Sequence, residues 1–402
     1  MPVIVESITT TPFEESAVTK PVALALPWYC FAIVLGASCI PVGVLWDISW
    51  HESIGRDTFW TPAHMVIYLG GMIPGLSCGW IVLKTTFWGT PEERARTVGF
   101  VGFRGPLGAW VTIWGALGML TSAPFDNWWH DAYGLDVKIL SPPHTLLAIG
   151  MGAVTIGALL LVLSWQNRLA EPQRQGAAWL FVFMGGILLT MQSLFLTEFS
   201  FPNHQHAGMF YKVSAVLYPA ILIFTARAST LRWPAVTAAA VYMGIYLMMI
   251  WCLPLFPAQP KLAPIYNPIT HMVPPPFPLL VILPALGIDL VMRRFKTKSA
   301  AIRPWWIECL RALGLALIFL ALFVPVQWLL SSFLISTAAE NWFFAGNRLW
   351  SYSNNLGEWT HRFWDMEKDP FRWQTIGWAF GIAWLSALFG LWRGEWMRRV
   401  KR

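Results

Sequence analysis

The sequence predicts an all-α fold, a polytopic transmembrane helical bundle of about ten spans with both termini in the cytoplasm. Hydrophobic residues make up 56% of the 402 residues and charged residues only 12%, about half the charged share of a soluble domain. Many hydrophobic residues lie in runs of about 20, the length that a helix needs to cross a bilayer. The 26 tryptophans fit such a protein, because indole rings favour membrane interfaces.

Ten hydrophobic runs set the order of the elements. We place these spans at residues 24–45, 63–84, 105–123, 143–165, 177–197, 208–229, 234–254, 275–293, 308–335 and 373–393. Four regions follow from them: a cytoplasmic N-terminal tail (1–23), hairpins with two metal motifs (24–165), further transmembrane helices (166–335), and a periplasmic aromatic loop with the last span and a basic cytoplasmic tail (336–402). The tail at 1–23 does not resemble a secretory signal, because its acidic residues precede any basic one.

Lysine and arginine are concentrated in the loops after the second, fourth, sixth and eighth spans and after the tenth. Loops rich in these residues face the cytoplasm. We therefore expect a multi-pass protein of the bacterial inner membrane, cytoplasmic or intracytoplasmic. The net charge of +7 then reflects membrane orientation, so the expected partner is the lipid bilayer and not nucleic acid.

The histidines fall in the other set of loops, which this orientation places outside. All eight of them do so: His51, His64, His130, His144, His204, His206, His271 and His361. Histidines with scattered structural roles would not sort in this way. The distribution predicts a metal-binding face on the periplasmic side.

Two of the outer loops carry the same arrangement of an aspartate and two histidines. In WDISWHESIGRDTFWTPAH (46–64), Asp47 is followed by His51 four residues later and by His64 at the mouth of the next span. In DNWWHDAYGLDVKILSPPH (126–144), the matching residues are Asp126, His130 and His144. A carboxylate and an imidazole four residues apart lie on one face of a helix. Each triplet is therefore a candidate three-ligand pocket.

A pocket of one carboxylate and two imidazoles leaves coordination positions open. Copper, zinc and non-haem iron all use such ligands, so the ligand type alone does not choose the metal. For a single motif, Asp47 pairing with Arg56 or capping a helix is an equally good interpretation. The presence of two motifs, together with the sorted histidines, favours metal binding. Asp57 either pairs with Arg56 or orients a ligand imidazole.

Other polar residues in and near the spans have weaker signals. Glu198, His204 and His206 form a third polar cluster, which is a third site, a set of supporting residues, a proton path or an ordinary exposed loop. His271 and His361 are isolated, and structural roles are expected for both. Inside the spans, we expect Asp289 to pair with Arg293 or to extend toward the interface, and Gln327 to bond to a neighbouring helix.

The stretch WHESIGRDTFWTPAH resembles the copper-binding segment of the C subunit of particulate methane monooxygenase and ammonia monooxygenase. That family binds copper with an Asp, a His four residues on and a further His after twelve residues, the positions of Asp47, His51 and His64. Its second site has an Asn where this chain has Asp126, followed by histidines at the spacing of His130 and His144. The resemblance covers roughly residues 40–165, and this chain is longer than the family's C subunit.

The resemblance implies a distant and enlarged relative that binds copper, with iron or zinc as alternatives. Partners similar to the family's A and B subunits, a quinol reductant and an oligomeric assembly are then expected. Our leading hypothesis is a copper monooxygenase, or its copper-bearing subunit, that oxidises a small apolar substrate with dioxygen at Asp47, His51 and His64. The alternative is a copper storage, delivery or transport protein without oxygenase activity. A haem-binding quinol oxidoreductase ranks last, because the histidines lie at the membrane edge beside carboxylates.

Overall fold

A computed structural model describes residues 26–134, 141–294, 304–346, 350–353, 359–364 and 369–402. These residues form a bundle of long helices with a single short hairpin, β1 (Val98–Phe100) and β2 (Phe103–Gly105). The prediction of an all-α polytopic transmembrane bundle is confirmed. The expected tail at 1–23 lies outside the described residues.

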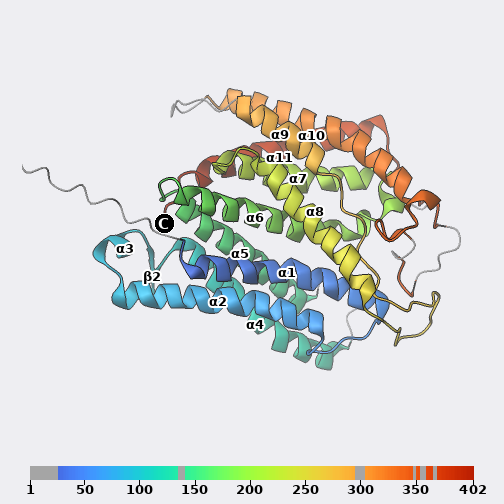
Figure 1. Cartoon of the computed structure of the whole chain (residues 1–402), viewed down its shortest axis with the longest axis horizontal. Helices are drawn as coiled ribbons and strands as arrows, with labels where there is room; N and C mark the ends of the chain where they lie inside the picture. Colours follow the sequence, from blue (N-terminus) through green and yellow to red (C-terminus); the bar gives the residue numbers. More distant parts are fainter. Residues whose placement is uncertain (1–25, 135–140, 295–303, 347–349, 354–358, 365–368) are drawn as a thin grey trace, which may run out of the picture.

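The helices run roughly along the length of the molecule and lie side by side in Figure 1. Their bounds are α1 (Trp28–Ser53), α2 (Pro62–Trp88), α3 (Pro91–Ala95), α4 (Leu107–Tyr133), α5 (Pro142–Gln166), α6 (Gln173–Ser193), α7 (Gly208–Ala228), α8 (Pro234–Cys252), α9 (Ile282–Arg294), α10 (Trp305–Leu334) and α11 (Trp373–Met397). Prolines open α2, α5 and α8, where their missing N–H group costs no helical hydrogen bond.

Eight helical segments of the described chain are long and apolar enough to cross a membrane. They are α1, α2, α5, α6 extended to Phe199, α7, α8 extended to Leu255, α10 and α11. These segments match eight of the ten predicted spans. The predicted span at 105–123 coincides with α4, which has 27 residues but is not one of these eight segments.

The predicted span at 275–293 is wrong, because a helix covers only its second half. Helix α9 has 13 residues and is about 20 Å long at 1.5 Å per residue. The first half is extended, although residues 272–279 are all buried. The cause is four prolines, which carry no N–H donor and interrupt a helix: Pro274, Pro275, Pro276 and Pro278.

Side chains accept hydrogen bonds from three of the N–H groups in this extended segment. The acceptors come from three helices: Val273 donates to Ser53 Oγ over 2.7 Å, Leu279 to the Tyr242 hydroxyl over 3.2 Å, and Leu280 to Gln327 Oε1 over 3.0 Å. Non-helical backbone at membrane depth is stable only when protein covers it and satisfies its polar groups. The segment packs beside the outer part of α1, where the first metal motif lies.

The two intramembrane polar residues also have roles that the sequence did not predict in full. We expected Asp289 to pair with Arg293 or to extend toward the interface, and the structure shows it bonded to backbone N–H groups. Its two carboxylate oxygens accept the N–H groups of Ala235 and Val236 at 3.2 and 3.0 Å, so it caps the start of α8. Gln327 bonds Leu280 and also donates to Gln205 Oε1 over 2.6 Å, so it joins two connecting segments and not a neighbouring helix.

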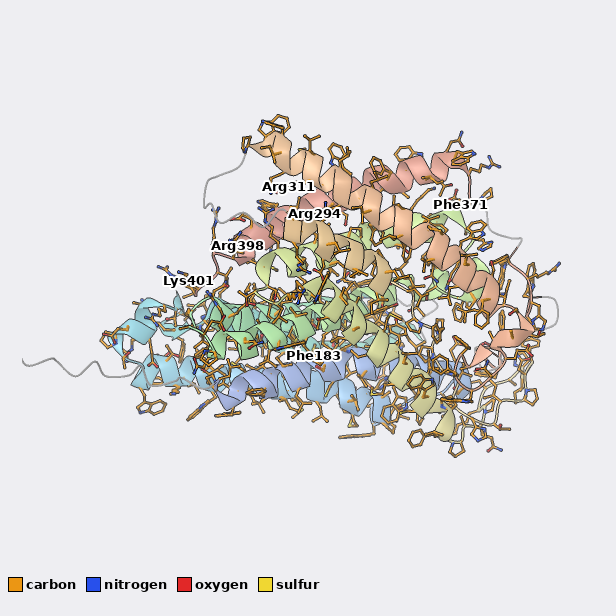
Figure 2. The ribbon with its side chains drawn as sticks, turned by 45° about the horizontal axis from the view of Figure 1, so that its top comes forward. Phe183, Arg294, Arg311, Phe371, Arg398 and Lys401 are labelled. Carbon is orange, nitrogen blue, oxygen red and sulfur yellow. The ribbon has the colours of Figure 1, made fainter. Side chains whose placement is uncertain are left out.

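Helix α2 packs between α1 and α4, and α4 packs on α5. The α4–α5 contact is close because glycines face it: a Cβ atom at Gly115 would lie 2.6 Å from the Val154 nitrogen, a type of approach common between membrane helices. This packing places the end of α1, the start of α2, the end of α4 and the start of α5 at one end of the bundle (Figure 1). In Figure 2, four labelled basic residues lie toward the opposite end: Arg294, Arg311, Arg398 and Lys401.

Candidate metal centre

The structure brings the first predicted triplet together at the junction of α1 and α2. Asp47 and His51 lie in the last two turns of α1, and His64 is in the first turn of α2. The Nε2 atom of His64 lies 3.1 Å from Asp47 Oδ1, and the Nε2 atom of His51 lies 3.8 Å from Asp47 Oδ2. Two helices that are adjacent in the chain therefore bring these three side chains into one cluster, with Asp47 between the two imidazoles.

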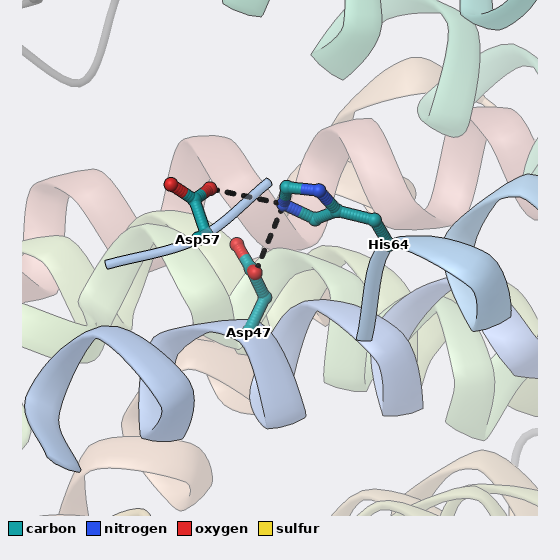
Figure 3. A group of neighbouring side chains, drawn as sticks. All are labelled: Asp47, Asp57 and His64. Carbon is teal, nitrogen blue, oxygen red and sulfur yellow. Dashed lines mark ion pairs between the residues drawn. The ribbon is translucent and has the colours of Figure 1, made fainter. Parts of the chain in front are cut away.

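A fourth side chain, Asp57, lies in the same cluster. Its Oδ2 atom is 3.4 Å from His51 Nε2 and 3.4 Å from His64 Nε2, whereas no ion pair joins it to Arg56 among the described residues. Figure 3 shows Asp57 and Asp47 converging on the ring of His64. Within the described chain, these three residues are the only such group whose ligand atoms all lie within 4.8 Å of one another. His51 contacts both carboxylates but lies at the edge of this group.

The sequence reasoning did not place Asp57 among the candidate ligands. The signal that was present is a second carboxylate seven residues before His64, in the short connection between two helices that already carry ligands. Two features of the turn direct the Asp57 carboxylate toward the histidines. Gly55 has a φ of +82°, which favours glycine, and the Trp50 indole donates to the carbonyl of Arg56 over 2.9 Å.

The hydrogen bond with His51 and the nearby charge of both histidines hold the pKa of Asp57 below its usual range. Asp57 is therefore a carboxylate anion at neutral pH. The cluster is open on one side only. The side chains of His51 and Asp57 are 47% and 36% exposed, against 21% for His64 and 22% for Asp47. Solvent therefore reaches the cluster mainly from the side of His51 and Asp57.

In the second predicted triplet the carboxylate also lies beside both imidazoles, but the ligand atoms of Asp126, His130 and His144 do not all lie within 4.8 Å of one another. Asp126 and His130 lie near the end of α4, and His144 lies in the first turn of α5. The Nε2 atoms of His130 and His144 are each 3.5 Å from an oxygen of Asp126, and the two imidazole rings are 6.5 Å apart. The Nδ1 atom of His130 donates to the carbonyl of Gly134 over 3.2 Å, which turns Nε2 toward Asp126.

One carboxylate oxygen in each cluster is buried without a hydrogen-bond partner. These atoms are Asp47 Oδ1 and Asp126 Oδ1, and each is the oxygen that faces the histidine of the following helix. An unsatisfied buried acceptor costs about 1–3 kcal/mol, and more when it is charged. A bound cation, or a proton on the facing imidazole, would remove this cost. Among the described residues, the group whose spacing fits a metal ion is Asp47, Asp57 and His64.

The two clusters are neighbours on the same end of the bundle. Tyr68 lies one turn beyond His64 on α2, with its ring 6.2 Å from the imidazole. Its phenol is within electrostatic reach of Asp47, Asp57 and Asp126. Helix α2 therefore lies between the two candidate centres, and its Tyr68 is near both of them.

The third predicted cluster does not join this arrangement. Glu198 is exposed, His204 stacks on Trp364 at 4.8 Å between ring centres, and His206 lies between the rings of Trp328 and Phe363 at 3.5 and 3.4 Å. Burial lowers the pKa of His206, which keeps its ring neutral. In the described part of the chain, Glu198, His204 and His206 do not form a group with metal-ligand spacing.

The remaining two histidines have local partners. The His271 ring bonds the hydroxyl of Thr270 at 2.9 Å. The Nε2 atom of His361 lies 3.3 Å from Glu340 Oε1, and its Nδ1 atom donates to the carbonyl of Ile335 over 3.0 Å. His361 therefore pairs with Glu340, whereas the sequence suggested that it is isolated.

Comparisons of the chain with protein-family models, with curated proteins and with solved structures find no match.

Proposed function

We propose that this multi-pass membrane protein holds copper at Asp47, His51 and His64 and acts as a copper monooxygenase or as the copper-bearing subunit of one. The observation that carries this proposal is the convergence of two Asp–His–His triplets, each with an orphaned carboxylate oxygen facing an imidazole. Iron and zinc fit the same donors. The resemblance of the segment 46–64 to copper-binding sequences is what favours copper.

The residues of the first cluster divide the work of binding. Asp47 supplies a negative charge from a largely buried position on α1. His64 supplies a nitrogen whose direction is fixed by its bond to Thr58, and His51 supplies a ligand on the exposed side. Bound copper would supply one-electron chemistry with dioxygen. Beside it, the ring of Tyr68 lies 6.2 Å from His64, and the ring of Phe59 lies 5.1 Å from Tyr68 and 5.0 Å from Trp60. They provide an apolar wall, which suits a small apolar substrate arriving from the lipid.

The wider assignment follows from the same proposal. The clusters lie at the end of the bundle opposite the basic residues, so we assign them to the periplasmic side of a bacterial inner membrane. Asp126, His130 and His144 form a second copper centre. Electrons come from outside the chain, with a quinol as the donor, and A-like and B-like subunits complete an oligomeric assembly.

Copper handling without oxidation is the second candidate function. It is favoured by the exposure of the His51 side chain, which is 47%, because a soluble copper carrier has direct access to that ligand. Both clusters lie at one end of the bundle, which favours storage or delivery over transport.

Oxygen incorporation separates the two functions. Copper-loaded protein in lipid vesicles is given duroquinol, propane and ¹⁸O-labelled dioxygen, and the expected product is ¹⁸O-labelled propanol. His64→Ala should abolish the product, whereas His271→Ala, a histidine away from both clusters, should not. The alternative outcome has two parts: copper-retaining protein forms no product, and its copper passes to a soluble Cu(I) acceptor. That result would establish copper handling instead.

A further inference from the structure

We propose that Asp57 is a fourth ligand of the first centre, and that its withdrawal opens a coordination position for an outside ligand. The inference rests on metal binding by the first cluster, as proposed above, and concerns the ligand set and not the oxidation chemistry. With Asp57 bound, the predicted three-ligand pocket becomes a pocket of two carboxylates and two imidazoles. All four coordination positions are then filled until Asp57 withdraws.

The separations of the four ligand atoms carry the inference. Ligands about 2.0–2.1 Å from an ion in a tetrahedral site lie roughly 3.3 Å from one another. The four carboxylate–imidazole separations in the cluster are 3.1, 3.4, 3.4 and 3.8 Å. Asp57 Oδ2 contributes two of them, so it occupies the place of a ligand as fully as Asp47 does. His51 lies outside the group whose ligand atoms are all within 4.8 Å of one another, so its exposed ring has to turn inward to complete the set.

A hydrogen-bonding role for Asp57 from outside the ligand set fits the geometry less well. A residue that orients a ligand imidazole contacts the nitrogen that points away from the metal. In His64 that nitrogen is Nδ1, and it already donates to the carbonyl of Thr58 over 2.9 Å. Asp57 instead faces Nε2 of both histidines, the atoms that face Asp47.

Charge selects the kind of ion that this pocket takes. Two carboxylates neutralise a divalent cation, and oxygen ligands favour divalent ions over the softer Cu(I). Asp57 is also the member of the set that no helix carries, since it lies between the end of α1 at Ser53 and the start of α2 at Pro62. Helices fix the backbones of the other three ligands, whereas the backbone of Asp57 can shift, so we assign the displacement to Asp57.

The test uses the full chain in detergent, with His130→Ala and His144→Ala in every sample to remove the second cluster. Zn(II) affinity is measured by competition with a coloured chelator, and azide binding to the Cu(II)-loaded protein by absorption. We expect Asp57→Ala to weaken Zn(II) binding by 100-fold or more and to strengthen azide binding at least tenfold. Asp57→Asn should give intermediate values, and Asp131→Asn, which removes a carboxylate elsewhere on the same face, should match the parent.

Equal Zn(II) and azide affinities in the parent and in Asp57→Ala would overturn the fourth-ligand assignment. Weaker Zn(II) binding with unchanged azide affinity would overturn the opening of a coordination position. A parent that binds no Zn(II) would overturn both this inference and the proposed function. If the Zn(II) and azide results are as expected but the protein does not oxidise propane, Asp57 remains a ligand. Only the proposed oxygenase activity is then overturned.

Discussion

The Nδ1 atom of His64 donates a hydrogen bond to the backbone carbonyl of Thr58 over 2.9 Å. This contact fixes the tautomer of the imidazole and turns Nε2 toward Asp47 and Asp57. The turn that presents the carbonyl is itself held by a hydrogen bond from the Thr58 N–H group to Thr61 Oγ1, over 2.8 Å. One buried hydroxyl thus supports the direction of a metal ligand three residues away.

Thr61→Ala should therefore weaken metal binding without removing any ligand. The loss of a supporting contact of this kind typically costs 10- to 100-fold in metal affinity, and we expect about tenfold for Zn(II). Thr61→Ser keeps the hydroxyl and should restore the affinity. Thr90→Ala is the matched control, because Thr90 caps α3 at the other end of the bundle. Unchanged Zn(II) affinity in Thr61→Ala would show that the turn does not orient His64.

Stability should depend on pH through His206. Burial between Trp328 and Phe363 lowers its pKa below the usual value of 6.5, so the unfolded chain binds this proton more readily than the folded chain. The neutral ring's contribution is fully present above about pH 6.5 and is lost as the pH falls toward the lower folded pKa. His206→Phe removes this contribution. Thermal unfolding between about pH 7.5 and 5 should show a smaller loss of stability in the variant than in the parent. An equal fall of unfolding temperature with pH in both proteins would contradict this role of His206.

Gln327 should be essential to the broken span. Gln327→Leu leaves the Leu280 N–H group and the Gln205 amide without their partner, and each unsatisfied buried group costs about 1–3 kcal/mol. We expect a clearly lower unfolding temperature in detergent. Gln374→Leu, at an exposed position at the start of α11, is the control and should unfold like the parent. Equal stability of both variants would mean that water replaces the Gln327 amide.

Asp289→Ala should destabilise the protein by removing the cap of α8. Loss of a capping side chain costs about 0.5–2 kcal/mol, and the buried position of Asp289, which is 1% exposed, places the cost at the upper end. Asp289→Asn keeps one acceptor oxygen and should lose about half as much. Unfolding by a denaturing detergent measures the difference. A variant as stable as the parent would exclude the capping role.

The long hydrophobic runs predicted eight of the spans because length and apolar character are local properties of the chain. The failure at 275–293 has one local cause and one distant cause. Composition alone counted Pro274 to Pro278 as apolar, and the acceptors that allow extended backbone there come from Ser53, Tyr242 and Gln327, which are distant in sequence. A window of hydropathy contains no information about such partners.

The Asp–His pair of each triplet was predictable because i and i+4 positions lie on one face of a helix, and the third residue follows because the next helix packs back against the first. Asp57 was missed because it lies in a turn, where direction depends on the φ of Gly55 and on the Trp50 indole. His204 and His206 carried the right side chains for a ligand role, but their surroundings are aromatic rings from α10 and the outer loop. Those contacts join residues more than 120 positions apart, beyond the reach of a motif.

Metal content of the purified protein is the most direct test of the central claim that both clusters bind a transition metal. The parent, loaded with copper and washed, should retain about two ions per chain by mass spectrometry of the metal. The triple variant Asp47→Ala, His51→Ala, His64→Ala should retain one, as should the matching variant at Asp126, His130 and His144. Full copper retention when the first triplet is removed would contradict the account.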